Sequence, residues 1–456
     1  MALNFTRALA GASKPEPKPA PPSDIDGAWM GTLDIGAMRL RVVFHITNTG
    51  DGLTGTMDSP DQGMKGMPVT SVARSDMNLK IEARQIGGEF NGKISKDLGS
   101  LDGTWTQNGG TLPLVLKRVK DQSELERRRP QNPVKPYPYH EEDVSYENKA
   151  QNVMLAATLT VPQGKGPFRA ALLITGSGPQ DRDETLLGHK PFLVLSDYLT
   201  RNGVAVLRAD DRGTAKSTGV FASATTADFA TDAEAGVAYL KTRSEVDPHK
   251  IGLIGHSEGG IIAAMVAARN PDLAFIVMMA GTGVPGDEIL MEQAQAIERI
   301  LGKSPEEIQE DLTEEREMLS LVENQKDEAV LDKELRAKMG GKIPEARVGM
   351  QIAQVTSPWF RYFISYDPAT ALRKVRCPVL AMIGEKDVQV PPEENLPAIR
   401  RALAEGGNQH FEVVEMPGLN HLFQTAPTGA PSEYAEIEET ISPTALQKIS
   451  TWILQQ

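Results

Sequence analysis

A serine stands at the centre of Gly255-His256-Ser257-Glu258-Gly259, between the apolar run 251–254 and the alanine-rich run 261–269. A GxSxG pattern between a strand and a helix is typical of a sharp turn that presents the serine hydroxyl to solvent, and its glycines let the two elements approach closely. We therefore predict that Ser257 is the nucleophile of an acyl-transfer reaction. The alternative is a serine that only caps the helix.

A neutral serine hydroxyl is a weak nucleophile, so a histidine must take its proton and a carboxylate must orient the imidazole. The expected chain order is serine, acid, histidine. Of the seven histidines, only His410 and His421 lie far enough downstream. His410 begins the run 410–416, which is predicted to be a strand. His421 lies in the loop after it, from which a ring can reach back over a sheet, so His421 is the predicted base.

The orienting acid is expected just after the apolar strand 379–383. Two carboxylates stand there, Glu385 and Asp387. Glu385 fits a surface turn better, so the predicted acid is Asp387. The long separation of Asp387 from Ser257 leaves room for an insertion between them.

An acyl-transfer intermediate carries a negative oxygen, which needs two backbone N–H donors. One donor is usually the residue after the nucleophile, here Glu258, and the other lies in the loop after the third strand. That loop is Thr175 to Pro179. We choose the amide of Ser177 over that of Gly178, and a plain glycine-rich turn is the alternative.

A group of charges follows another predicted strand, at Asp210-Asp211-Arg212. Two adjacent carboxylates could be mistaken for a catalytic pair. We interpret them instead as paired loop charges that hold the turn at Ser257 in place.

The elements that must position these residues form a repeating pattern. Continuous apolar runs, as expected of strands covered on both faces of a parallel sheet, occupy 170–175, 204–208, 251–254, 275–280 and 379–383. Between them, apolar residues recur at helical spacing. The pattern predicts a doubly wound α/β fold.

The alternation stops over about 284–365, where a long helical insertion is predicted to act as a lid. Within 287–347 there are 17 acidic and nine basic residues, which is most simply a solvated helical face. So acidic a surface disfavours landing on anionic lipid. Trp359, Phe360 and Phe363 end the insertion, beside Tyr362. Core packing and the wall of an acyl pocket both fit these aromatic residues, and we take Trp359, Phe360 and Phe363 as candidates for substrate binding.

The first part of the chain has a different pattern. Residues 1–23 form a proline-rich leader, and 24–118 alternate apolar and polar residues between glycine-rich turns. This period of two predicts a small antiparallel all-β domain, a barrel or sandwich of about eight strands. Residues 119–143, rich in arginine and proline, are predicted to be a solvated linker, and 144–456 the α/β catalytic domain.

The amino-acid composition disfavours several classes of binding partner. The 48 basic and 61 acidic residues give a net charge of −13, which argues against nucleic acid. No run is apolar and long enough for a membrane helix. The single Cys377 allows no disulfide, and neither a metal nor a nucleotide motif is present, so no cofactor is expected. Residues 1–13 resemble a clipped secretion signal, so a periplasmic or secreted protein is expected, with a cytoplasmic one as the alternative. A homo-oligomer is left open.

The sequence resembles the α/β-hydrolase superfamily, specifically bacterial two-domain carboxylesterases that are often described as serine aminopeptidase-like. The resemblance lies in TGSGPQDRDE, DDRGTAKSTG, GHSEGG, GEKDVQVP and GLNHLF, which begin at residues 175, 210, 255, 384 and 418. It implies a serine hydrolase acting on small esters, with Ser257, Asp387 and His421 at the positions of the family's triad. Thr175 departs from the histidine found in many relatives.

The expected function is therefore hydrolysis of short-chain acyl esters, small-molecule substrates, through an acyl-enzyme on Ser257. The alternative is a peptidase, in which acidic residues of the insertion bind a positive α-amino group. A third hypothesis, a binding protein that keeps the hydrolase fold without activity, is disfavoured by the complete set of Ser257, Asp387 and His421.

Overall fold

The computed structural model describes residues 23–35, 39–62, 64–107, 109–121, 125, 127–341 and 345–456, without the side chains of 345–347. The described residues form two compact units, one mostly of residues up to Leu125 and the other mostly of Glu126–Gln456. Residues 1–22 of the predicted leader, and with them the predicted secretion signal, lie outside the described residues.

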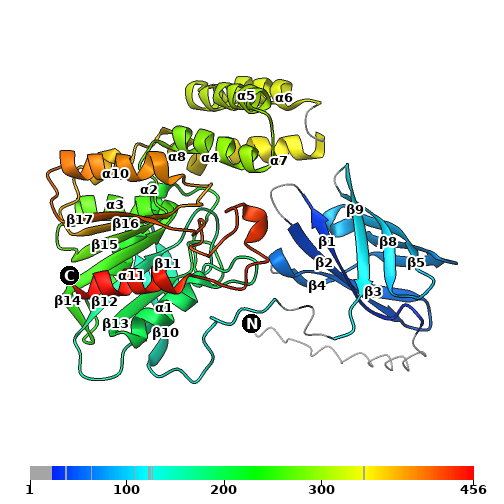
Figure 1. Cartoon of the computed structure of the whole chain (residues 1–456), viewed down its shortest axis with the longest axis horizontal. Coiled ribbons are helices and arrows are strands. Elements are labelled where there is room, and N and C mark those ends of the chain that lie inside the picture. The colour runs from blue at the N-terminus through cyan, green and yellow to red at the C-terminus, as the bar shows by residue number, and fades with distance from the viewer. Residues whose placement is uncertain are drawn as a thin grey trace, which may run out of the picture. The chain divides into compact units, whose positions relative to one another are not determined.

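The N-terminal unit is an antiparallel β-sheet (Figure 1). Its described strands are β1 (Gly27–Asp34), β2 (Arg39–Asn48), β3 (Leu53–Ser59), β4 (Met64–Pro68), β5 (Ser71–Ser75), β6 (Asn78–Ala83), β7 (Gly88–Ile94), β8 (Ser100–Gln107) and β9 (Gly110–Arg118), in the order β4-β3-β2-β1-β9-β8-β7-β6-β5. Alternate residues turn inward, and Trp29, Phe44 and Phe90 are fully buried there. The predicted antiparallel β-domain is confirmed, and its described strands belong to a single sheet.

The second unit contains a mostly parallel sheet. Its described strands are β10 (His140–Asn148), β11 (Val153–Val161), β12 (Phe168–Ile174), β13 (Val204–Ala209), β14 (Val246–His256), β15 (Phe275–Met279), β16 (Val379–Gly384) and β17 (Phe411–Met416), in the order β10-β11-β13-β12-β14-β15-β16-β17. The strands from β13 to β17 pair in parallel, and β11 pairs antiparallel with β13. The first strand begins at His140, inside the range predicted to be a linker.

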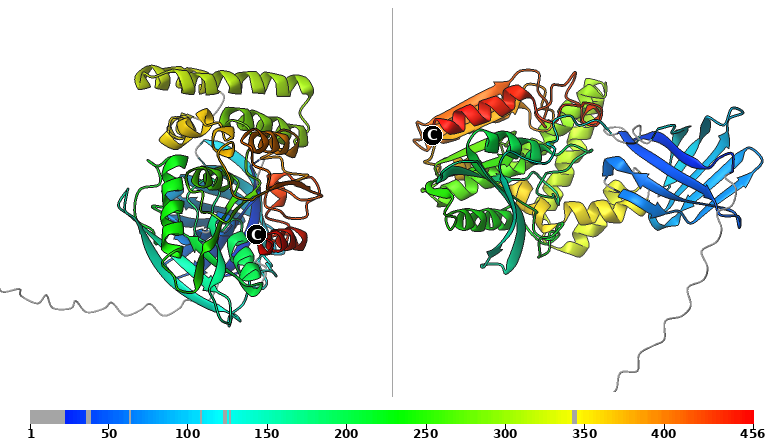
Figure 2. Two further views of the ribbon diagram at one scale, coloured as in Figure 1. Left: turned by 90° about the vertical axis from the view of Figure 1, so that its left-hand side faces the viewer. Right: turned by 90° about the horizontal axis from the view of Figure 1, so that it is seen from below.

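Helices cover both faces of this sheet (Figures 1 and 2). One face packs on α1 (Pro191–Arg201) and α11 (Pro443–Leu454). The other packs on α2 (Thr226–Leu240), α3 (Glu258–Arg269), α9 (Ala369–Leu372) and α10 (Pro392–Glu405). Because both faces are buried, the central strands are continuously apolar, as in FIVMM of β15, where every residue is buried. The predicted doubly wound α/β fold is confirmed.

The helical insertion lies between β15 and β16, and its helices gather on one side of the α/β unit (Figure 1). They are α4 (Gly286–Ile300), α5 (Pro305–Asn324), α6 (Glu328–Met339), α7 (Glu345–Val355) and α8 (Pro358–Ser365). Side chains of Ser304, Asp327 and Ser357 accept hydrogen bonds from backbone N–H groups at the starts of α5, α6 and α8. These N-caps satisfy donors that have no partner within the helix.

One basic residue of the predicted linker is not a solvated connection. The guanidinium of Arg129 donates hydrogen bonds to the backbone carbonyls of Leu187, Ala435 and Ile437 at 2.9, 2.9 and 3.0 Å. Arg129 therefore ties together segments of the α/β unit that lie far apart in the sequence. Composition could not reveal this role, because it depends on loops that meet only after folding.

Candidate active site

The turn between β14 and α3 holds Ser257 in an unusual backbone conformation. Its φ is 54° and its ψ is −119°, and its N–H donates to the carbonyl of Met279 at 2.8 Å. A positive φ is rare for a residue with a Cβ atom and stores backbone strain. A Cβ atom at Gly255 would overlap the carbonyl of Gly259, and a Cβ atom at Gly259 would overlap the carbonyl of Ile174, so glycines here let α3 lie against the ends of β14 and β12. This is the geometry expected of a serine nucleophile.

The predicted base and acid are in direct contact. His421 Nδ1 lies 3.0 Å from Asp387 Oδ1 and 2.9 Å from Oδ2, and both residues are buried. Asp387 Oδ1 also accepts the backbone N–H groups of Gln389 and Val390, at 2.9 and 2.8 Å. These bonds fix the carboxylate, which in turn orients the imidazole with Nδ1 toward Asp387. Among the described residues, no hydrogen bond engages Nε2, which is the nitrogen expected to take a proton.

Ser257 and His421 line one pocket. Among the described residues, no hydrogen bond joins the Ser257 hydroxyl to the His421 ring in this structure. Such bonds often form fully only when substrate is bound. The rejected alternatives do not line this pocket: His410 is exposed, and the carboxylate of Glu385 accepts the N–H of Gly418 at 2.7 Å.

The predicted oxyanion donors meet at the same place. Glu258 is the first residue of α3, where N–H groups have no partner within the helix. Ser177 lines the pocket that contains Ser257, whereas Gly178 lines an adjacent cavity. The N–H of Gly176 is not available, because it donates to Glu184 Oε1 at 2.8 Å. The placement favours Ser177 over Gly178.

Glu184 is a buried residue to which sequence reasoning gave no role. Its Oε1 accepts the N–H of Gly176 and lies 2.9 Å from His256 Nδ1. The other ring nitrogen of His256 lies 3.1 Å from the backbone carbonyl of His421. Burial lowers the pKa of His256, but the charge and hydrogen bond of Glu184, together with the His421 carbonyl and the charge of Asp387, raise it above its ordinary value. Glu184 and His256 thus connect the oxyanion loop, the Ser257 turn and the His421 loop.

The carboxylates after β13 hold the loop that follows β12, residues 175–182, rather than the Ser257 turn. Asp211 accepts the hydroxyl of Thr175 at 2.7 Å and the N–H of Gln180 at 2.9 Å. Asp210 accepts Nε and Nη2 of Arg182 at 3.0 and 2.8 Å. Burial raises the pKa of Asp211 to about 8. The expectation that these charges support the turn is therefore corrected, because Asp210 and Asp211 bind residues 175, 180 and 182, and Arg212 binds Asp232 of α2.

The aromatic candidates separate into two groups. Trp359 and Phe363 line the pocket of Ser257, and their rings stack with 5.3 Å between centroids. Phe360 does not line this pocket and is buried in the core of the α/β unit. Trp359 Nε1 also donates to Glu258 Oε1 at 2.8 Å. The pocket has an unfilled volume of about 980 Å³, including its open mouth.

Neither a cluster of metal ligands nor a membrane-spanning helix is found among the described residues. In these ranges, no three or more His, Cys, Asp or Glu side chains are grouped so that they could hold a metal ion. No helix in the same part of the chain has both the length and the apolarity that a bilayer span requires.

A mostly parallel sheet covered on both faces, with a strained serine between its central strand β14 and helix α3, defines an α/β-hydrolase. A family model described as "Serine aminopeptidase, S33" matches residues 191–425. Because this match covers slightly more than half of the chain, the chain belongs to this family and is a hydrolase.

Individual proteins are similar to the chain over similar lengths. Esterase EstD of Thermotoga maritima is 24% identical over 323 residues, which are 71% of this chain and 69% of that protein. Esterase Pf2001 of Pyrococcus furiosus superposes with a TM-score of 0.43 at 15% identity, covering 70% of this chain and 93% of that one. A dienelactone hydrolase from Anabaena variabilis superposes with a TM-score of 0.40 at 16% identity, covering 70% of this chain and 99% of that one.

Proposed function

We propose that this protein is a serine carboxylesterase that hydrolyses esters of short-chain acids through an acyl-enzyme on Ser257. The observation that carries the proposal is the buried Asp387–His421 hydrogen bond, made by a histidine that shares a pocket with Ser257. The similarity to esterase EstD supports an ester rather than an amide as the substrate.

In the proposed reaction, Ser257 Oγ attacks the ester carbonyl carbon while its proton passes to His421 Nε2. Asp387 keeps the imidazole in the required tautomer and stabilises the imidazolium. The N–H groups of Glu258 and Ser177 stabilise the oxyanion, and such a donor contributes about 2.7 to 4 kcal/mol. When the C–O bond breaks, His421 returns the proton to the leaving alcohol. Water then attacks the acyl-Ser257 ester by the same steps and releases the acid.

The helical insertion supplies the apolar wall for this reaction and is proposed to be the lid. Its residues Ile289, Leu290, Trp359 and Phe363 line the pocket. Burial of an acyl chain against them would contribute about 0.8 kcal/mol per methylene group. The acidic outer surface of the insertion disfavours anionic lipid, so the proposed substrate is a dissolved small ester.

Turnover of p-nitrophenyl acetate and butyrate, measured beside that of aminoacyl-p-nitroanilides, tests this function. The native protein should hydrolyse the esters and be labelled by a fluorophosphonate probe, and Ser257→Ala should do neither. Cleavage of the anilides alone would replace the esterase by an aminopeptidase. Absence of labelling in folded native protein would favour a binding protein.

The aminopeptidase alternative is favoured by the description of the family, but it needs a carboxylate to bind the substrate's α-amino group. Among the described residues that line the pocket, the insertion contributes no carboxylate. The two carboxylates that do line it, Glu184 and Glu258, accept hydrogen bonds from protein donors. This arrangement favours the esterase.

A further inference from the structure

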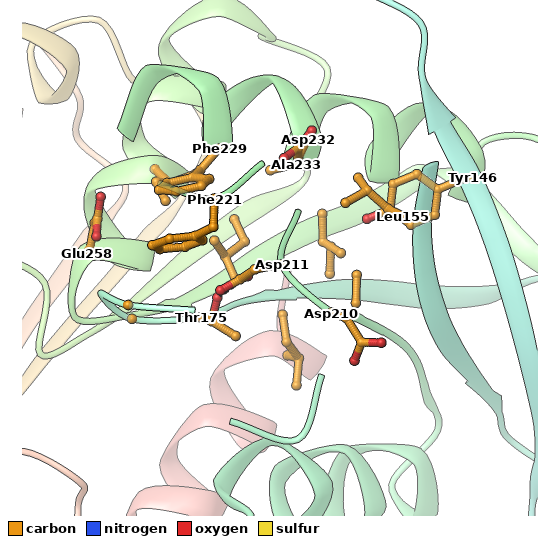
Figure 3. A pocket seen from close by; sticks show the side chains of 17 residues that line it. Tyr146, Leu155, Thr175, Asp210, Asp211, Phe221, Phe229, Asp232, Ala233 and Glu258 are labelled. Atoms are coloured by element: carbon orange, nitrogen blue, oxygen red, sulfur yellow. Dashed lines mark hydrogen bonds between the residues drawn. The ribbon is translucent and has the colours of Figure 1, made fainter. Parts of the chain in front are cut away.

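A second cavity adjoins the catalytic pocket, between the sheet and helices α2 and α3 (Figure 3). The space inside it that a group the size of a water molecule can occupy is about 50 Å³. Apolar side chains line one part of it: Leu172, Ile174, Phe221, Phe229, Ala233 and Ile262. The rings of Phe221 and Phe229 stack with 5.1 Å between centroids. This part of the cavity suits an alkyl group.

The other end of the second cavity is polar, but its carboxylates are already engaged. Asp210 and Asp211 bind Arg182 and Thr175, and Asp232 accepts Nε of Arg212 at 2.6 Å. A charged ligand would have to compete with these bonds. The apolar end therefore offers the more favourable place for part of a substrate.

Glu258 stands between the two cavities. Only Glu258 and Gly176 line both of them among the described residues, and glycine has no side chain. Figure 3 shows the Glu258 carboxyl beside the rings of Phe221 and Phe229. The residue is 3% exposed and lines both cavities, so it lies at the boundary between them.

In the part of the chain that the structure describes, hydrogen bonds and no ion pair hold the carboxyl of Glu258. Its Oε1 accepts the hydroxyl of Thr226 at 2.7 Å and Nε1 of Trp359 at 2.8 Å. Burial raises the pKa of this carboxyl, against the hydrogen bonds from Thr226, Trp359 and Ser177. Thr226 begins α2 and Trp359 belongs to the insertion, so the wall is fixed from both sides. A side chain fixed in this way is a rigid boundary of the catalytic pocket.

We propose that the Glu258 side chain sets the acyl-length limit of the enzyme, because it closes the passage from the catalytic pocket to the cavity at Phe221 and Phe229. The inference rests on the proposed esterase function and concerns only the side chain of Glu258, since its backbone N–H is the oxyanion donor. Without this side chain, a six-carbon acyl chain reaches the second cavity. Burial of each further methylene group multiplies kcat/KM by roughly four.

The experiment compares kcat/KM for p-nitrophenyl acetate, butyrate and hexanoate in four proteins: native, Glu258→Ala, Glu258→Gln and Glu258→Ala with Ala233→Leu. Relative to the native protein, Glu258→Ala should raise the hexanoate-to-butyrate ratio about tenfold or more. Glu258→Gln keeps the size and the acceptor oxygen and should keep the native ratio. Ala233→Leu fills the second cavity and should return the ratio to within about threefold of the native one.

Fluorophosphonate labelling and circular dichroism show which variants are folded and active. If Glu258→Ala does not fold, Glu258→Asn shortens the side chain but keeps an acceptor. An unchanged ratio in a folded and labelled variant overturns the inference, and so does a shift that Ala233→Leu fails to reverse or that Glu258→Gln reproduces in full. If the native protein turns over no ester at all, the proposed function itself fails.

Discussion

The catalytic end of the α/β unit and the core of the N-terminal β-sheet are built in opposite ways. At the catalytic end, Glu184, His256, Glu258, Asp387 and His421 all carry ionisable groups and are at most 7% exposed. The largest fully buried side chains of the β-sheet are aromatic and aliphatic. Burying ionisable groups costs free energy unless each finds a partner. Each of these groups has a hydrogen-bond partner elsewhere in the chain, so their burial depends on several loops staying together.

The same comparison applies to the backbone. Ser257 has a positive φ between a strand and a helix. In the β-sheet, by contrast, Phe90 and its neighbours lie in regular paired strands, with Phe90 opposite Trp105. Strain at Ser257 is tolerated because the surrounding sheet and helix hold it in place. Substitutions in the two regions should therefore separate activity from stability.

The largest loss of activity is expected from Ser257→Ala, because the proposed nucleophile is removed. Turnover of p-nitrophenyl butyrate should fall by about 10⁴-fold or more. The thermal unfolding temperature should change little, since the substitution removes one small polar atom at a pocket surface. Steady-state kinetics and calorimetry measure the two effects. Residual turnover above a few per cent of the native rate would show that another group is the nucleophile.

Asp387→Asn should follow, with a loss of about 10⁴-fold in kcat, because an amide favours the wrong imidazole tautomer. The matched control is Glu385→Gln, which changes the neighbouring carboxylate outside the pocket and should keep native turnover. Equal losses in both variants, measured under the same conditions, would contradict the assignment of the acid.

Glu184→Gln should reduce kcat by about tenfold to a hundredfold, because small displacements of positioned groups have effects of this size. Glu184 is a positioning residue that acts through Gly176 and His256. The KM for butyrate should change much less than kcat, since the hydrogen bonds of Glu184 go to Gly176 and His256. A change in KM alone would mean that Glu184 instead binds the substrate.

The stability of the same variant should depend on pH. Glu184 raises the pKa of His256 in the folded protein, so their interaction stabilises the fold fully below the ordinary histidine pKa of about 6.5. The stabilisation is lost as the pH rises through the raised pKa. Chemical denaturation between about pH 5 and pH 9 measures the free energy of unfolding of both proteins. The native protein should be more stable than Glu184→Gln, and the difference should be largest at the acid end. A difference that grows with pH would contradict the pairing.

The smallest effect on activity is expected from Phe90→Ala in the β-sheet. Phe90 is fully buried in the core of the other compact unit, and its loss should destabilise that unit by about 3 to 5 kcal/mol. Turnover by the folded fraction should remain within about twofold of native. Calorimetry measures the loss of stability, and kinetics below the first unfolding transition measure the turnover. A large fall in kcat there would show that the β-sheet contributes to catalysis.

Several elements could be predicted from local patterns. Continuous apolar runs predicted the central strands, since a strand covered on both faces needs apolar residues throughout. The alternation before Lys117 predicted the antiparallel sheet, because one of its faces is buried. Boundaries were harder to predict: β10 begins at His140, where polar residues of an edge strand do not differ from those of a linker.

What the sequence alone determined is the set of candidates Ser257, Asp387 and His421, because each follows a strand whose pattern is local. Only the tertiary structure decided which residues support them. Glu184 meets His256, and Trp359 meets Glu258, across separations of 72 and 101 residues. No local pattern encodes such contacts, because they exist only once the loops at one end of the sheet have come together.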